Sequence, residues 1–147
     1  MTAAPEILGS VSEENIERIK RVESAFNRGD LDDMLSHIAP DAEWEISESN
    51  PSARTLHGHD EIRAYLADWR DTVHGLHYEA SRYVDAGDAV VQLGTMTSRV
   101  GGGDAELTVP LAFVTRFRDG VPVRTEEYLD VEQALEAAEG SRIRPGR

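Results

Sequence analysis

Four strand-like segments follow one another in the second half of the chain, and this run constrains the fold more than any other feature. Short turn-forming sequences, DAGD, GGGD and RDG, separate the segments, and Asp-Gly is among the strongest signals for a tight hairpin turn. Successive strands joined by such turns pair antiparallel, so the sequence predicts a long meander. The segments lie near residues 76–84, 89–99, 105–117 and 122–129.

Helical patterns precede the meander. Ser12, followed by two glutamates, is typical of a helix start, and apolar residues then recur at helical spacing until Gly29. Helices followed by an antiparallel meander indicate an α+β domain in which the helices cover one face of a curved sheet. The other predicted elements are a short helix over 31–38, a half-buried strand over 41–47, a loop over 50–57, a third helix starting at His59 or Asp60, and a last helix over 131–139.

The third long strand is apolar on both faces. Leu111 and Phe113 belong to one strongly apolar face, while Pro110, Ala112 and Val114 make the middle of the other face apolar too. A sheet with apolar surface on both sides needs a cover on each side. We therefore expect the outer face to form a homodimer interface.

Length and charge limit the classes of protein and partner. A chain of 147 residues fits one domain, which we place over 12–139, between a flexible N-terminus at 1–11 and a flexible basic tail at 140–147. The net charge of −13 disfavours binding to nucleic acid or an anionic membrane. Without a signal-peptide pattern or a membrane-spanning apolar run, we expect a cytoplasmic protein.

Three stretches of the sequence resemble the SnoaL-like branch of the NTF2-like superfamily, which includes ketosteroid isomerases and polyketide cyclases. The stretches are FNRGDLDDMLSHIAPDAEWEI, HGHDEIRAYLADW and FVTRFRDGVPVRTEEYLD, and the likeness extends over residues 12–138. The resemblance implies an NTF2-like cone, with N-terminal helices packed on a curved, mainly antiparallel sheet that encloses an apolar pocket. It is weaker guidance to activity, because this fold hosts enzymes, binding modules and scaffolds.

The catalytic groups of the known branches are mostly missing here. At the positions that match the ketosteroid isomerase tyrosine, basic aspartate and second acid, this chain has Val22, Ile46 and Phe113. The Arg-x-Asp pair of limonene epoxide hydrolases is also missing, because Arg99 is followed by Val-Gly. The resemblance to polyketide cyclases of the SnoaL type places their single acid at Glu127.

The two neighbouring glutamates near the end of the last strand must point to opposite faces of the sheet. Glu127 shares its face with Val123 and Thr125, and this face is the more apolar, so Glu127 is predicted to point inward and Glu126 outward. An apolar pocket would raise the pKa of Glu127 toward the range useful for proton transfer. Alternatively, Glu127 is an exposed residue at a strand end, or it pairs with a histidine or an arginine.

His57, on the loop before the third helix, is the second candidate for acid–base chemistry. No metal site is expected, because neither His-Gly-His nor His-Gly-Leu-His matches a zinc spacing, and the chain has no cysteine. No cofactor is expected either. The pocket wall against a flat ligand, or alternatively part of the core, is predicted to comprise Trp44, Ile46, Tyr65, Trp69, Phe113 and Thr125.

Three functions remain open at this point. The first is a cofactor-independent isomerase, cyclase or lyase that moves a proton on a small hydrophobic carbonyl compound. The second is a non-catalytic module that binds a small apolar ligand in the same pocket. The third is a dimeric interaction protein whose working surface is the outer sheet face.

Overall fold

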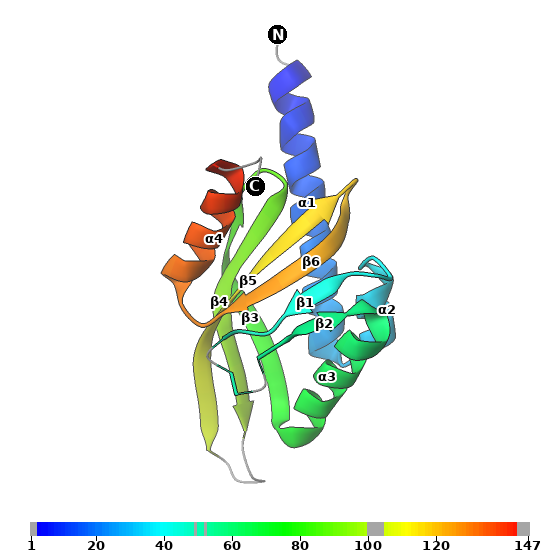
Figure 1. Ribbon diagram of the computed structural model, residues 1–147, viewed down its shortest axis with the longest axis vertical. Coiled ribbons are helices and arrows are strands. Elements are labelled where there is room, and N and C mark those ends of the chain that lie inside the picture. Colours follow the sequence, from blue (N-terminus) through cyan, green and yellow to red (C-terminus); the bar gives the residue numbers. More distant parts are fainter. Residues whose placement is uncertain (1–2, 49, 52, 100–104, 144–147) are drawn as a thin grey trace.

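Six strands form one curved sheet in which the first strand lies beside the last. The computed structural model describes residues 3–48, 50–51, 53–99 and 105–143. The strand order is β2-β1-β6-β5-β4-β3, and β1 runs parallel to β6 while the other neighbours are antiparallel (Figure 1). The strands are β1 (Glu43–Glu45), β2 (Thr55–His57), β3 (His74–Asp85), β4 (Ala89–Arg99), β5 (Glu106–Arg118) and β6 (Val121–Tyr128).

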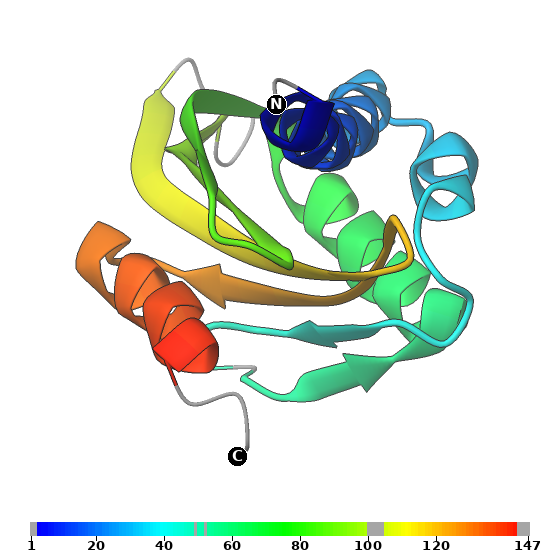
Figure 2. The same cartoon turned by 90° about the horizontal axis from the view of Figure 1, so that it is seen from above.

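Three helices pack on the concave side of this sheet, and a fourth packs on its other side (Figure 2). Buried apolar side chains of the second and third helices, such as Leu35 and Leu66, join Trp44 and Phe113 of the sheet in the main core. These helices therefore supply one wall of the interior and the sheet supplies the other. The helices are α1 (Ala3–Arg28), α2 (Leu31–Ser36), α3 (Gly58–Thr72) and α4 (Val131–Ile143).

Several element boundaries differ from those predicted. Helix α1 begins at Ala3 rather than Ser12, because Pro5 is compatible with a first helical turn, whose N–H groups have no partner within the helix. The predicted loop over 50–57 contains β2, whose residues form a strand because they pair with β1. Helix α4 continues past Gly140. The predicted hairpin tip over 101–104 lies outside the described residues, and the domain limits at 12 and 139 stay a prediction.

The outer face of the sheet has a cover within the chain. Ala134 and Ala138 of α4 are buried against Val91, Ala112 and Val114 of β4 and β5. The apolar middle of β5 therefore does not need a second copy of the protein to bury it, and the homodimer stays a prediction. Among the described residues, no helix has the length and apolar character needed to cross a membrane.

The pairing of β3 with β4 contains a bulge after Ala80. Gly94 pairs with Ala80 at an irregularity in the register of β3. A Cβ atom on Gly94 would lie 2.8 Å from the Ala80 Cα and would overlap the carbonyl oxygen of Glu79. Glycine is therefore required at this point by close approach of two backbones.

Candidate functional site

A cavity of about 50 Å³ lies between the three N-terminal helices and the concave face of the sheet. Apolar and aromatic side chains form most of its wall. The polar residues in the wall are Glu23, Gln92, Thr115 and Thr125. The wall is completed by Ile19, Val22, Phe26, Met34, Ile38, Trp44, Leu66, Trp69, Tyr78, Met96, Phe113 and Pro122.

Four of the six residues predicted for the pocket wall line this cavity: Trp44, Trp69, Phe113 and Thr125. The rings of Trp44 and Phe113 meet edge to face with centroids 5.9 Å apart, which fixes both side chains on the sheet side. The other two predicted wall residues lie elsewhere. Ile46 is fully buried in the main core, and Tyr65 contacts Glu127 instead.

Glu127 is buried behind the cavity wall, with only 5% of its surface exposed. It accepts hydrogen bonds from Trp44 Nε1 at 2.7 Å, from the Tyr65 hydroxyl at 3.1 Å and from the Ser47 backbone N–H at 3.4 Å. All three donors are uncharged. Within the described part of the chain, no lysine, arginine or histidine forms an ion pair with this carboxylate.

This environment changes the acidity of Glu127. Burial raises the pKa of the carboxyl group, and it outweighs the hydrogen bonds from Trp44, Ser47 and Tyr65, which act in the opposite direction. Burial also raises the pKa of Tyr65, so its hydroxyl stays protonated and remains a donor. The alternative of an exposed or ion-paired Glu127 is therefore wrong, and the predicted inward orientation is right.

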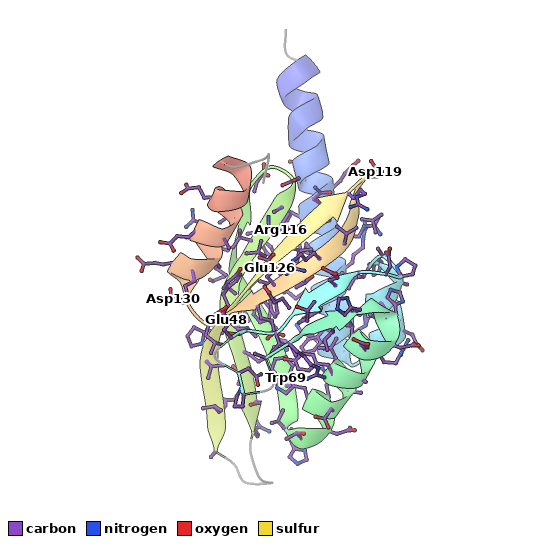
Figure 3. All side chains as sticks on the ribbon, viewed as in Figure 1. Glu48, Trp69, Arg116, Asp119, Glu126 and Asp130 are labelled. Atoms are coloured by element: carbon purple, nitrogen blue, oxygen red, sulfur yellow. The ribbon has the colours of Figure 1, made fainter. Side chains whose placement is uncertain are left out.

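Glu126 points to the opposite face together with Arg124 and Tyr128, as predicted. It is nevertheless buried. Only 6% of its surface is accessible, because Arg116, Arg124 and the Tyr128 hydroxyl surround it. Figure 3 shows Arg116 and Glu126 close together on β5 and β6. Arg116 also donates a hydrogen bond to the Ala137 carbonyl oxygen, so α4 contacts this group of charged residues.

The two arginines reverse the effect of burial on Glu126. Burial alone would raise its pKa, but the hydrogen bonds and charge of Arg116, with further hydrogen bonds from Arg124 and Tyr128, lower the pKa below its usual value. Two adjacent glutamates with nearly equal burial therefore have pKa shifts of opposite sign. Their difference lies in the charge of their neighbours.

His57 is not brought together with Glu127. It ends β2 opposite Glu43, and its Nδ1 lies 3.4 Å from the Glu43 carboxylate. Its side chain is 64% exposed and does not line the cavity. Residues 55–57 pair as a strand, and this pairing puts the His57 side chain on the same face as Glu43 rather than with Trp44. A role of His57 in acid–base chemistry stays a prediction. The described residues contain no group of three or more metal-binding side chains.

Sequence reasoning missed a second polar group, on the α1 side of the cavity. Glu23 accepts hydrogen bonds from the Tyr83 hydroxyl at 2.8 Å and from Gln92 Nε2 at 3.0 Å. The signal was present in the helical spacing, because Glu23 lies four residues after Ile19 and three before Phe26, both on the inward stripe. A carboxylate on that stripe is a candidate site residue.

The raised pKa of Glu127 predicts a resonance that titrates. The chain has two tryptophans, and one indole N–H donates to this carboxylate. We expect the Trp44 indole ¹H–¹⁵N signal to shift with a midpoint above the usual glutamate value of 4.5, and the Trp69 signal to stay nearly constant. Glu127→Gln removes the transition, and Glu48→Gln, at an exposed position next to Ser47, preserves it. A midpoint at or below 4.5 would contradict the raised pKa.

Known proteins share both the sequence pattern and the fold. The SnoaL-like domain family matches residues 19–125. An NTF2-like protein of unknown function from Burkholderia pseudomallei is similar with a TM-score of 0.72 and 25% identity, over 84% of this chain and 95% of that chain. TerC, co-crystallised with polyporic acid, is similar with a TM-score of 0.72 and 28% identity, over 86% of this chain and 98% of that chain.

A third similar structure is an NTF2-like protein from Burkholderia xenovorans, with a TM-score of 0.67 and 30% identity, over 86% of this chain and 96% of that chain. The curated proteins compared with this chain contain no match. These similarities confirm the predicted α+β class and the NTF2-like fold. Because the family match spans well over half of the sequence, the chain belongs to the SnoaL-like domain family.

Proposed function

We propose that this protein binds a small, mainly apolar carbonyl compound and moves a proton on it without a cofactor, with Glu127 as the acid–base group. The observation that supports this most strongly is a buried carboxylate whose hydrogen-bond donors, within the described residues, are all neutral. Burying a carboxylate without a counter-charge costs free energy, so stability does not explain its presence. Groups with such perturbed acidity cluster at functional sites.

The proposed step needs only the carboxyl group and the substrate. The Glu127 carboxylate takes a proton from the carbon next to the carbonyl, and the electron pair of the broken C–H bond moves to the carbonyl oxygen to form an enolate. Glu127 is then a neutral acid, which its buried surroundings favour. Returning the proton to another carbon completes an isomerisation, and the carboxylate is regenerated. The raised pKa brings the group closer to the pH at which both transfers are efficient.

The size of the cavity limits the proposed substrate. Pockets for drug-sized ligands typically measure roughly 300–1,000 Å³, whereas this cavity has a volume of about 50 Å³. Since one water needs roughly 10–15 Å³ by this kind of measure, the space suits a few waters or one compact molecule. A compound as large as a steroid does not fit this conformation, and the replacements Val22, Ile46 and Phe113 also argue against steroid isomerisation.

Binding without turnover is the second candidate, and one observation favours it. Glu127 does not itself line the cavity; the Trp44 side chain, which does, donates to its carboxylate. A base must come within about 3 Å of the proton that it removes, or reach it through one water. Catalysis therefore requires the Trp44 or Tyr65 side chain to shift when the ligand binds, whereas simple binding requires no shift.

Proton exchange in heavy water tests the proposal. Cyclohexanone serves as the probe, and NMR follows the loss of the signals from its protons next to the carbonyl. We expect the wild-type protein to accelerate exchange and Glu127→Gln to lower that rate by about 10²–10⁴-fold. The variant should keep its affinity for cyclohexanone, measured by the fluorescence of the two tryptophans, because both line the cavity.

The matched control is Glu48→Gln, which removes the same charge from an exposed residue labelled in Figure 3. Its exchange rate should equal that of the wild type. Binding of cyclohexanone with no acceleration above the buffer rate would favour the non-catalytic module. An exchange rate that survives Glu127→Gln would exclude Glu127 as the base.

We also propose a homodimer through the outer face of the sheet. Exposed apolar side chains at Leu129 and Val131, beside the start of α4, support an interface that α4 does not complete. A monomeric mass at high concentration would contradict it. The small hydrophobic molecule as partner and the cytoplasmic location stay predictions.

A further inference from the structure

We propose that the α1 side of the cavity is a subsite for a protonated amine, with the Glu23 carboxylate as its counter-charge. The inference deepens the proposed function and rests on one part of it, namely that the cavity takes a small ligand. It does not depend on catalysis by Glu127. Glu23 and Gln92 both line the cavity, so this polar group faces the space directly, in contrast to Glu127.

Hydrogen bonds hold the Glu23 carboxylate in place from one side. The Tyr83 hydroxyl on β3 donates to it at 2.8 Å, and Gln92 Nε2 on β4 donates at 3.0 Å. Both bonds reach the same oxygen, Oε1, and the hydrogen bonds shown for the described residues include none to Oε2. The arrangement therefore orients the carboxylate and leaves one of its oxygens for a ligand.

The Glu23 carboxylate has no cationic partner in the described part of the chain. Among the ion pairs of the described residues none includes Glu23. The nearby Lys20 lies 3.6 Å from the Glu17 carboxylate and 5.3 Å from the centre of the Tyr83 ring. A carboxylate at an apolar cavity wall without a cation favours a ligand that supplies one.

The hydrogen-bonding capacity of the subsite fits an ammonium group. Gln92 uses its amide nitrogen to bind Glu23, which leaves its carbonyl oxygen as a second acceptor. An ammonium group has three donors and no acceptor, so it can bind two acceptors at once. The aromatic wall residues, among them Trp69 and Tyr78, offer apolar faces to the rest of such a ligand and π-surfaces to its charge. Combined with the proposed reaction, the substrate class becomes a compact carbonyl compound that also carries an amine.

Two probes of similar shape test the subsite. Benzylamine is protonated at pH 7 and benzyl alcohol is neutral, and the quenching of tryptophan fluorescence measures the binding of each. We expect the wild type to bind benzylamine at least about tenfold more tightly. Glu23→Gln should abolish this preference while leaving the affinity for benzyl alcohol within about twofold. Glu17→Gln, which removes an exposed charge from the same helix, should retain the preference.

A second measurement uses the wild-type protein alone, so it does not depend on whether Glu23→Gln folds. The side-chain amide signals of Gln92 should shift more when the protein is saturated with benzylamine than when it is saturated with benzyl alcohol. Equal binding of the two probes by the wild type, or a preference that survives in folded Glu23→Gln, would overturn the subsite. Loss of proton exchange in Glu127→Gln bears only on the reaction, so failure of the reaction and failure of the amine subsite are distinguishable.

Discussion

Replacing Glu126 with glutamine is expected to lower the free energy of unfolding by about 3 kcal/mol at pH 7, whereas the same replacement at Glu127 changes it by less than about 1 kcal/mol. Both carboxylates are buried, with 6% and 5% of their surfaces exposed. Glu126 pairs with both Arg116 and Arg124. Its loss leaves the half-buried Arg116 without an ion-pair partner among the described residues, whereas Arg124 keeps Glu43 and Glu45. Glu127 pairs with no cation among the residues that the structure describes, so removing its charge relieves a desolvation cost.

The two variants should also differ in their dependence on pH. The folded-state pKa of Glu126 is lowered, so its stabilising contribution is complete above the usual value of 4.5 and is lost as the pH falls through the folded-state pKa. The folded-state pKa of Glu127 is raised, so its contribution is complete below 4.5 and is lost as the pH rises through the folded-state pKa. Glu126→Gln is therefore most damaging near neutral pH, where Glu127→Gln is most favourable relative to the wild type.

Urea unfolding of the wild type and both variants at pH 5 and pH 7.5 measures these differences. From the lower to the higher pH, Glu127→Gln should gain stability relative to the wild type, and Glu126→Gln should not. Equal losses in the two variants would show that hydrogen bonding, which both substitutions disturb, outweighs charge at these positions.

Gly94→Ala is expected to lower the free energy of unfolding by about 3 kcal/mol or more. The added methyl group would overlap the Glu79 carbonyl oxygen and lie 2.8 Å from the Ala80 Cα, so a strand backbone must move. Neither of these atoms belongs to a flexible side chain that could turn away. Because β3 and β4 form the end of the sheet against which α1 packs, the movement also disturbs the wall that carries Gln92.

Gly75→Ala is the control, because its glycine has a different role. Gly75 has a φ angle of 62°, and an added Cβ would meet no atom within 4 Å. Only backbone strain opposes the substitution, with an expected cost of about 1–2 kcal/mol. Urea denaturation of both variants compares the two costs, and a Gly94→Ala variant as stable as the wild type would show that the bulge in β3 adjusts freely.

The sequence predicts the local elements of this fold well and its long-range pairings poorly. Turn signals and alternation were enough to place the meander from β3 to β6, because strands joined by short hairpins pair with their neighbours. They were not enough to find β2, which has three residues and no pattern of its own. Its identity as a strand comes from β1, and no local signal reports this partner.

The candidate site was predictable to the same extent. Alternation along β6 predicted correctly that Glu127 points inward, and helical spacing placed Trp69 on the cavity wall. Alternation tells which face a side chain occupies but not what covers that face, so the burial of Glu126 was missed. Glu23 was missed for a related reason. A charged residue within an apolar stripe looks like a break in the pattern, and its hydrogen-bond partners, Tyr83 and Gln92, lie on strands that the local sequence does not identify as neighbours.

The position of β6 between β1 and β5 has a consequence for folding during synthesis on the ribosome. Until the residues near 121–128 emerge, the β1–β2 hairpin and the strands β3 to β5 have no common neighbour to join them. Helices α1, α2 and α3 are synthesised earlier, and their apolar faces stay uncovered until the sheet forms. Exposed apolar surface of this kind is what chaperones bind and what leads to aggregation. The strand that carries both glutamates is thus also the one that joins the two parts of the sheet, and it is made only after α1, α2 and α3.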